Sequence, residues 1–288
     1  MKEGIVVKNM NGYFYVQDQE GGLHECKVRG RLKQKRYSLL VGDKVVYGED
    51  GFVESILPRY SELYRPAVAN INQVILVVAA HMPDINTLLL DRLCVSIEDK
   101  DLPFLICINK YDLADERTKE VEVIYKQAGY EVLYTSTYTG QGLSELKERL
   151  KHKITAFAGP SGVGKSSLLN AVEPAFNFQT GQVSDKIKRG RHTTRHASLY
   201  ALGADSFIMD TPGFSSLDMS HISLERLPTL FPEILAREGH CKYNPCYHDK
   251  EPVCAIKEAV ASGAIHPSRY ANYLQLRQEI QEQIKKRY

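Results

Sequence analysis

The sequence lacks the long apolar segments that membrane proteins carry. Among its 288 residues no apolar run approaches the ~18–20 residues that a helix needs to cross a bilayer. The beginning, Met1-Lys-Glu-Gly-Ile-Val6, also lacks the long apolar stretch of a signal peptide. We therefore expect a cytoplasmic protein with no membrane partner.

Cysteine and net charge are scarce as well. The chain has 6 cysteines and a net charge of +2, while its 43% hydrophobic and 25% charged residues are ordinary for a globular protein. Because thiols stay reduced in the cytoplasm, clustered cysteines there indicate a metal site rather than disulfides. The length favours about two or three domains.

A phosphate-binding loop is the strongest motif. The segment Gly159-Pro-Ser-Gly-Val-Gly-Lys-Ser166 fits Gly-x-x-x-x-Gly-Lys-Ser/Thr, and it lies between an apolar strand (154–158) and a helix that Ser167 opens. The glycines allow close approach of the backbone to an anion. The predicted phosphate-binding residues are Gly159, Pro160, Ser161, Gly162, Val163, Gly164, Lys165, Ser166 and Ser167, with Lys165 at the β- and γ-phosphates and Ser166 on Mg²⁺.

A second motif predicts the base that is bound. Apolar strands at 72–80 and 103–108 are typical of a buried parallel sheet, and the second ends in Asn109-Lys-Tyr-Asp112. This resembles the guanine-specificity motif of GTPases, in which Asp112 would accept from guanine N1–H and the 2-amino group. Lys110 would lie along the base. Adenine offers no such pair of donors, which disfavours an ATP-dependent enzyme such as a kinase.

Three further segments resemble the remaining GTPase motifs. Thr135, Ser136 and Thr137 match the motif whose backbone N–H groups meet guanine O6. The stretch 186–196 looks like the first switch, in which Thr194, with Thr193 as second choice, would close on Mg²⁺ and the γ-phosphate. In Asp210-Thr-Pro-Gly213, Asp210 would hold Mg²⁺ through water and the Gly213 N–H would meet the γ-phosphate.

The sequence lacks the glutamine that usually orients the attacking water in GTPases. Ras-like proteins orient the attacking water with a glutamine directly after Asp-x-x-Gly, but Phe214 stands there. His192, with His196 second, is the nearest substitute in sequence; alternatively both histidines hold the switch or contact RNA. The predicted catalytic residues are Lys165, Thr194, His192 and Gly213. Phe214 also leaves open a GTP-regulated RNA-binding module with little or no hydrolysis.

The first part of the chain predicts a small β-barrel. Five short stretches rich in β-branched and aromatic residues are separated by turn-forming pairs such as Asn11-Gly12, and an OB-fold suits them. Between the third and fourth lies a basic loop, 27–36. It is either a contact for the RNA backbone or a solvated loop without a partner.

The last part carries a metal pattern. Cys241, Cys246, His248 and Cys254 follow the spacing Cys-x4-Cys-x-His-x5-Cys. Three thiolates and one imidazole form a closed tetrahedral set, so we expect one structural Zn²⁺ that does no chemistry.

The order of the motifs is unusual, because base recognition precedes phosphate binding. This order predicts a circularly permuted GTPase domain. With it, the chain resembles the ribosome small subunit-dependent GTPase A (RsgA) family of bacteria, and the four metal-site residues match that family's zinc motif one for one. The resemblance implies a multidomain α/β protein: an OB-fold barrel (1–62), a circularly permuted P-loop GTPase domain (63–222) and a mainly helical zinc-binding domain (223–288).

The resemblance also implies an activity and partners. The family hydrolyses GTP, is stimulated by the small (30S) ribosomal subunit and acts in late maturation of that subunit. We therefore expect a Mg²⁺-dependent GTPase that binds GTP/GDP, the small subunit and its rRNA, and that is a monomer.

Overall fold

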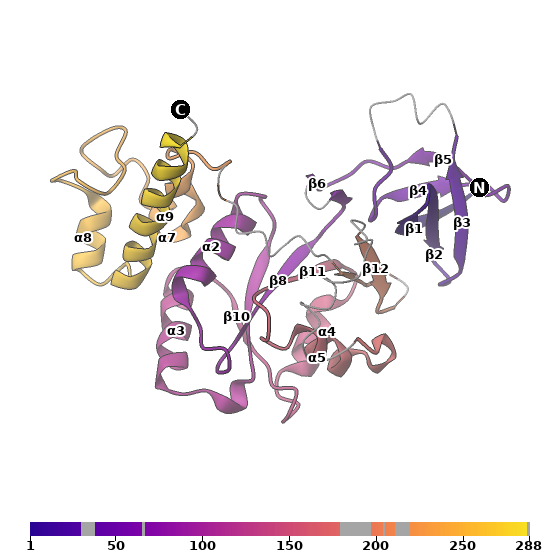
Figure 1. Ribbon diagram of the computed structural model, residues 1–288, viewed down its shortest axis with the longest axis horizontal. Coiled ribbons are helices and arrows are strands. Elements are labelled where there is room, and N and C mark those ends of the chain that lie inside the picture. The colour runs from indigo at the N-terminus through magenta and orange to yellow at the C-terminus, as the bar shows by residue number, and fades with distance from the viewer. Residues whose placement is uncertain are drawn as a thin grey trace.

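The structure is a computed structural model. It describes residues 1–29, 38–64, 67–178, 197–203, 205–210, 219 and 221–286, and of Tyr64 and Asp210 only the backbone. Figure 1 shows a β-barrel and a helical C-terminal part at opposite ends of a central α/β part. Across the described residues no helix has both the length and the apolar character required to span a membrane.

The N-terminal part is a closed barrel. Its strands are β1 (Lys2–Met10), β2 (Tyr13–Asp18), β3 (Leu23–Val28), β4 (Lys44–Tyr47) and β5 (Phe52–Ile56). They follow the order β1-β2-β3-β5-β4, and β4 closes on β1. This is the expected OB-fold arrangement. The predicted basic stretch 27–36 begins within β3, because Lys27 and Val28 both pair with β5.

The barrel joins the central sheet directly. Lys8 of β1 pairs with Ser198 of β12, so one eleven-stranded sheet runs through both in the described part of the chain. A hairpin of β6 (Glu62–Tyr64) and β7 (Ala67–Ala69) supports the joint, where the Ala69 N–H donates to Val41 O at 2.9 Å. A single cluster of buried apolar side chains extends from Val6 in the barrel to Ile108 in the central sheet.

The central sheet has the order β10-β9-β8-β11-β13-β12. All pairs are parallel except β12 with β13. Helices α2 and α3 cover one face, and α4 and α5 cover the other. The elements are β8 (Gln73–Ala79), α2 (Thr87–Glu98), β9 (Phe104–Asn109), α3 (Glu116–Gln127), β10 (Val132–Tyr134), α4 (Leu143–Leu150), β11 (Ile154–Ala158), α5 (Lys165–Val172), β12 (Ser198–Ala201) and β13 (Phe207–Asp210).

Local chemistry fixes several of these boundaries. Every residue of β8 is buried, as expected of a strand with helices on both faces. Helix α3 begins with a capping box, in which the Asp115 carboxylate accepts from the Thr118 N–H at 2.8 Å. Helix α2 begins after Asn86, whose side chain accepts from the Leu89 N–H at 3.0 Å.

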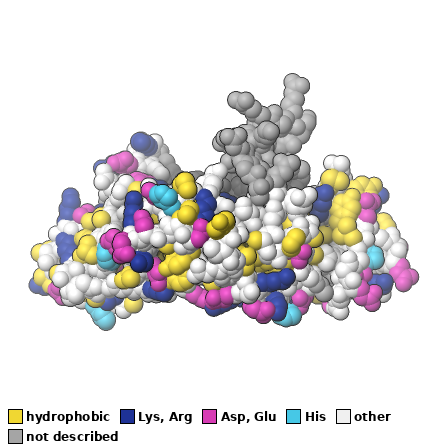
Figure 2. Space-filling model, turned by 90° about the horizontal axis from the view of Figure 1, so that it is seen from below, with side chains coloured by type: hydrophobic (Ala, Val, Ile, Leu, Met, Phe, Trp, Pro, Cys, Tyr) yellow, Lys and Arg dark blue, Asp and Glu magenta, His cyan; other side chains and the backbone are white. Residues whose placement is uncertain are grey.

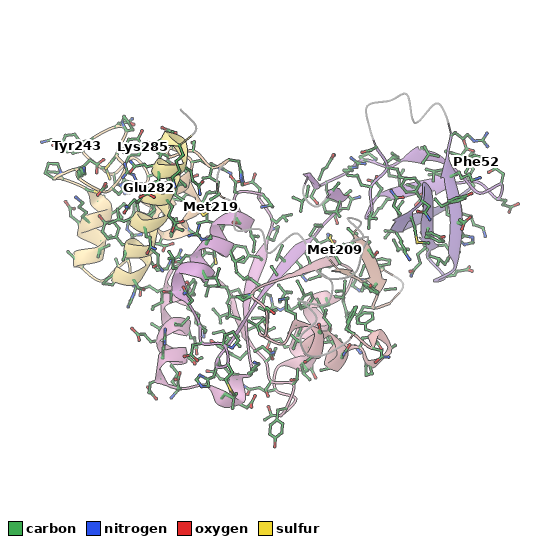
Figure 3. All side chains as sticks on the ribbon, in the orientation of Figure 1. Phe52, Met209, Met219, Tyr243, Glu282 and Lys285 are labelled. Carbon is green, nitrogen blue, oxygen red and sulfur yellow. The ribbon has the colours of Figure 1, made fainter. Side chains whose placement is uncertain are left out.

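The C-terminal part is mainly helical, as expected. It contains η3 (Leu227–Leu230), α7 (Pro232–Leu235), α8 (Ala255–Ala261) and the long α9 (Pro267–Lys285). Two other short helices, η1 (Tyr111–Leu113) and η2 (Pro174–Phe176), belong to the central part. Its apolar cluster includes Val95 of α2 and Met219, so this part packs directly on the central domain. Figure 3 shows Met219 beside α2 at this junction.

Candidate nucleotide and metal sites

The predicted nucleotide-binding segments meet at one edge of the sheet. Strands β9 and β11 both pair in parallel with β8, and β10 pairs in parallel with β9. The carboxyl ends of these strands therefore lie together. In open α/β sheets ligands bind outside these ends. Asn109 ends β9, Thr135 follows β10, and Gly159 follows β11.

The phosphate loop requires its glycines. Gly159 has a φ of +132°, and a Cβ there would lie 2.0 Å from Val77 O. Gly164 has a φ of +92°, and a Cβ there would lie 2.6 Å from the Asn109 side-chain nitrogen. Any side chain at either position would displace β8 or the predicted base-binding turn, residues 109–112, from the loop.

The Lys165 side chain folds back onto this loop. Its Nζ donates to the carbonyls of Gly159 and Pro160, each at 2.7 Å. Burial lowers the pKa of Lys165, which a bound anion would counteract. Helix α5 begins at Lys165, so the free N–H groups of Lys165, Ser166 and Ser167 lie at the helix start. This combination of amide donors and a cation suits a polyphosphate.

Asn109 connects the base-binding turn to the phosphate loop. It is buried, and its Nδ2 donates to Val163 O at 2.9 Å. Its Oδ1 accepts from the Thr135 hydroxyl at 3.1 Å, and this hydroxyl lies 3.2 Å from Cys107 Sγ. One side chain thus fixes the relative positions of three separate segments.

Lys110 and Asp112 face the same edge. Lys110 has a left-handed backbone with a φ of +56°, and its Nζ donates to Gly162 O at 2.9 Å and to Met82 O. Asp112 is exposed, and its Oδ1 accepts from the Ser136 hydroxyl. The Asp112 carboxylate is thereby oriented while it stays open to a ligand.

The Thr135–Thr137 segment offers one free backbone donor. The Thr135 N–H donates to Ile108 O and the Ser136 N–H to Gln141 O, both at 3.0 Å. Within the described residues the Thr137 N–H has no hydrogen-bond acceptor. Of the three predicted donors, the Thr137 N–H is therefore the one available to guanine O6.

Several predicted residues lie outside the described part of the chain. These are His192, Thr193, Thr194 and His196 of the first-switch segment, Gly213 and Phe214 of the second, and most of the basic loop. Asp210 is described by its backbone alone, at the end of β13 opposite Ser198.

Sequence reasoning missed the turn after β8. Its Met82 carbonyl helps to hold Lys110, and Pro83 lies close to the phosphate loop, since a Cβ on Gly162 would be 3.6 Å from Pro83 Cδ. The signal available in the sequence was the break from a continuous apolar strand to His81-Met-Pro-Asp84. A motif search does not detect this contact, because motifs specify side chains and a backbone carbonyl makes the contact.

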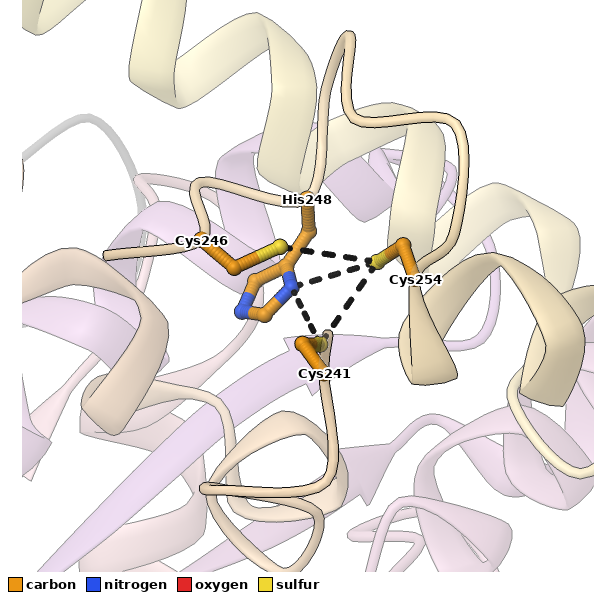
Figure 4. A group of neighbouring side chains, drawn as sticks. All are labelled: Cys241, Cys246, His248 and Cys254. Atoms are coloured by element: carbon orange, nitrogen blue, oxygen red, sulfur yellow. Dashed lines mark hydrogen bonds between the residues drawn. The ribbon is translucent and has the colours of Figure 1, made fainter. Parts of the chain in front are cut away.

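The four predicted metal ligands converge. The ligating atoms of Cys241, Cys246, His248 and Cys254 all lie within 4.8 Å of one another, and Figure 4 shows them turned towards a common centre. Cys254 Sγ lies 3.9 Å from both other sulfurs and 3.3 Å from His248 Nδ1. Tetrahedral zinc–thiolate bonds of about 2.3 Å separate sulfurs by about 3.8 Å, so these residues fit a zinc ion.

Helix α9 supports the metal-binding segment. The Tyr270 hydroxyl donates to His248 O at 2.6 Å, and the Tyr273 hydroxyl donates to Tyr247 O at 2.8 Å. Burial lowers the pKa of His248 and raises the pKa of Cys246 to about 12. Both shifts favour the uncharged side chains, so the imidazole is kept in the form that binds metal, whereas the Cys246 thiolate needs a compensating cation.

The charges on the surface are mixed. Figure 2 shows one face, on which basic and acidic side chains alternate along the whole molecule. On the barrel, Arg29 pairs with Asp50 at 2.5 Å and with Glu54 at 2.7 Å. The charge of Arg29, which follows β3, is therefore compensated by two carboxylates.

The fold and the site define the class of the protein. A parallel sheet whose central strand leads into a Gly-x-x-x-x-Gly-Lys-Ser loop, braced by an Asn-Lys-x-Asp turn, is a P-loop GTPase domain. The turn precedes the loop in the chain, so this domain is circularly permuted. Comparison with known families agrees: the RsgA GTPase family matches residues 56–220 and the RsgA N-terminal domain matches residues 3–55. The chain belongs to the RsgA GTPase family.

Individual relatives cover the whole chain. Proteins called small ribosomal subunit biogenesis GTPase RsgA are similar, at 46% identity in Shouchella clausii and 44% in Geobacillus thermodenitrificans, each over 100% of both chains. Among solved structures, YjeQ from Thermotoga maritima is 39% identical with a TM-score of 0.84, covering 97% of this chain and 98% of its own. YloQ, described as a circularly permuted GTPase, is 36% identical with a TM-score of 0.81, covering 98% and 96%.

Proposed function

We propose that this protein hydrolyses GTP to GDP and phosphate during late maturation of the small ribosomal subunit, and that it binds that subunit and its rRNA in the cytoplasm as a monomer. The names of relatives that match along the entire chain support this proposal. The observation that carries it is the contact between Asn109 and Val163 O. Through this contact one nucleotide can meet the base-binding turn and the phosphate loop together.

In this proposal each end of the nucleotide has its own residues. Asp112 accepts from the guanine N1–H and 2-amino group, and the Thr137 N–H donates to O6. Lys110 covers the base with its methylene groups while its Nζ stays tied to the phosphate loop. A base without these donors leaves a polar group unpaired, which is strongly disfavoured.

At the phosphate end, the loop amides and Lys165 bind and orient the β- and γ-phosphates. Mg²⁺ bound with GTP would neutralise charge on the phosphate oxygens, and the Ser166 hydroxyl is placed to hold it at the start of α5. We also propose Thr194 and Asp210 as Mg²⁺-binding residues, and Gly213 and His192 as contacts of the γ-phosphate and the attacking water. The four residues Cys241, Cys246, His248 and Cys254 would hold one structural zinc ion.

The decisive experiment is GTP turnover with and without purified small subunits, at several salt concentrations. We expect slow basal turnover, because Phe214 cannot orient water, and large stimulation that weakens as salt screens the RNA contact. GTP binding without stimulated turnover would instead favour a GTP-regulated RNA-binding module. We also propose the division into domains at about residues 62 and 222, which limited proteolysis can test.

A further inference from the structure

The turn after β10 is built around one buried hydroxyl. Ser136 Oγ accepts from the N–H groups of Tyr138 at 3.2 Å and Thr139 at 3.1 Å, and it donates to Asp112. The Gly140 N–H donates to Ser136 O at 2.9 Å and closes the turn. The position of Tyr138 is thereby linked to the Asp112 carboxylate through a single atom.

The end of the turn is fixed as well. Gly142 has a φ of +70°, and a Cβ there would lie 1.8 Å from Tyr134 O. The backbone therefore rests directly on the end of β10, where only glycine fits. These contacts hold the 136–142 turn in place without help from a ligand.

On this fixed turn the Tyr138 side chain is 90% exposed. Neither its ring nor its hydroxyl has a partner among the described residues. The neighbouring Tyr111 and Tyr134 differ, because their rings pack on each other with centroids 4.6 Å apart. A large aromatic side chain that is open to solvent on a rigid backbone is available for a ligand.

We propose that Tyr138 stacks on the guanine base and forms one wall of the nucleotide site. This inference rests on the proposed binding of GTP. The Asp112 carboxylate and the Thr137 N–H mark where the hydrogen-bonding edge of the purine docks, and Tyr138 is the next residue along the turn. Its ring can turn about χ1 to meet the base, since no side chain of the described segments holds it.

Stacking adds what the hydrogen bonds of Asp112 do not provide. Hydrogen bonds at the edge of the base select guanine, whereas contact with its face excludes water and adds affinity for any purine. Tyr138 should therefore influence affinity for GDP and GTP more than it influences the preference between nucleotides.

The test is calorimetric measurement of GDP affinity in the full-length protein. We expect Tyr138→Ala to weaken GDP binding about tenfold, because aromatic stacking on a base contributes on that scale. Tyr138→Phe should keep wild-type affinity, because the ring rather than the hydroxyl makes the contact. The control is Tyr243→Ala, another exposed tyrosine, which Figure 3 places in the C-terminal part; it should change nothing.

The outcomes separate this inference from the proposed function. Equal GDP affinity for Tyr138→Ala and wild type overturns the inference, while GTP binding and turnover by the wild type still support the function. If that variant binds GDP normally but loses stimulation by small subunits, Tyr138 contacts the partner instead, and the inference is wrong. A wild-type protein that binds no guanine nucleotide overturns both.

Discussion

A partly buried arginine, Arg59, and a fully buried one, Arg269, stand at the two junctions of the central domain, and they differ in what they join. Arg59, beside the barrel, makes a bidentate pair with Asp43 at 2.7 Å for each bond, and it also contacts Glu62 at 2.7 Å. Arg269 of α9 pairs with Glu233 of α7 at 2.7 Å and with Asp91 of α2. The first set comes from nearby positions in the chain, whereas the second joins segments far apart.

The Arg269 side chain is also more completely buried than the Arg59 side chain. Arg59 retains 11% exposure, whereas Arg269 is 2% exposed and packs against the rings of Tyr125, Tyr130 and Phe231. A guanidinium without access to water depends entirely on its partners. The barrel junction thus rests chiefly on strand pairing and apolar packing, while the C-terminal junction also depends on a desolvated charge network.

Metal removal should have the largest effect, and this effect should differ most between the two ends of the molecule. Zinc binding to small domains contributes on the order of 10 kcal/mol, so stripping the metal or making Cys254→Ser should unfold the segment around α8. Hydrogen exchange should rise there and stay unchanged in β1–β5, with one zinc per native chain by elemental analysis. A metal-free protein with native protection around α8 would remove the structural role of zinc.

The second prediction concerns Arg269→Met. The change leaves the Asp91 and Glu233 carboxylates buried without a cation, so the free energy of unfolding should fall by about 3–5 kcal/mol in urea titrations. The matched control is Arg226→Met. Arg226 pairs with Asp99 and Asp101 across the same junction but is 44% exposed, so its loss should cost less than about 1 kcal/mol. Similar losses for both variants would contradict the importance of burial.

The third prediction is that Arg59→Met costs less, about 2 kcal/mol, because Asp43 keeps its hydrogen bond from the Leu40 N–H at 2.8 Å and the other partner, Glu62, is 35% exposed. Amide exchange should rise in the barrel while GDP affinity is unchanged. If Arg59→Met destabilises the protein more than Arg269→Met does, the ranking of the two junctions is wrong.

Residue patterns identified the chemistry but could not identify this network. The phosphate loop, the Asn-Lys-x-Asp turn and the cysteine spacing are local, so each can be read from a few adjacent positions. Asp91 and Arg269 are 178 residues apart. Each looks like an ordinary charged residue on an amphipathic helix, and only the packing of α9 on α2 brings them together.

The strand pairing between barrel and sheet was also beyond the sequence. β1 extends to Met10 and pairs with β12 through Lys8, which short-range patterning did not predict. The free Thr137 N–H was likewise beyond the sequence. The closure of the turn decides which of the neighbouring N–H groups are already hydrogen-bonded. Residue types predict the kind of site, and tertiary contacts decide which atoms remain available.

The smallest predicted effect is at the start of α3, inside the central domain. The Thr118 N–H and hydroxyl donate to Asp115 and lower the pKa of its carboxyl. A lowered carboxyl pKa contributes stability above its unfolded value, and this contribution is lost as the pH falls through the folded value. Asp115→Ala should therefore lower the Tm at pH 7 slightly, with a difference that shrinks below about pH 4. The matched control is Glu120→Ala, exposed on the same helix, which should leave the Tm at pH 7 unchanged.

The central claim is that Asp112 and the phosphate loop grip one guanine nucleotide. The most direct measurement is the nucleotide preference of Asp112→Asn, determined by competition between GTP and xanthosine triphosphate. We expect GTP affinity to fall more than about 100-fold while xanthosine triphosphate becomes the preferred ligand, because an asparagine amide donates to the xanthine carbonyl. Retained preference for GTP would contradict it.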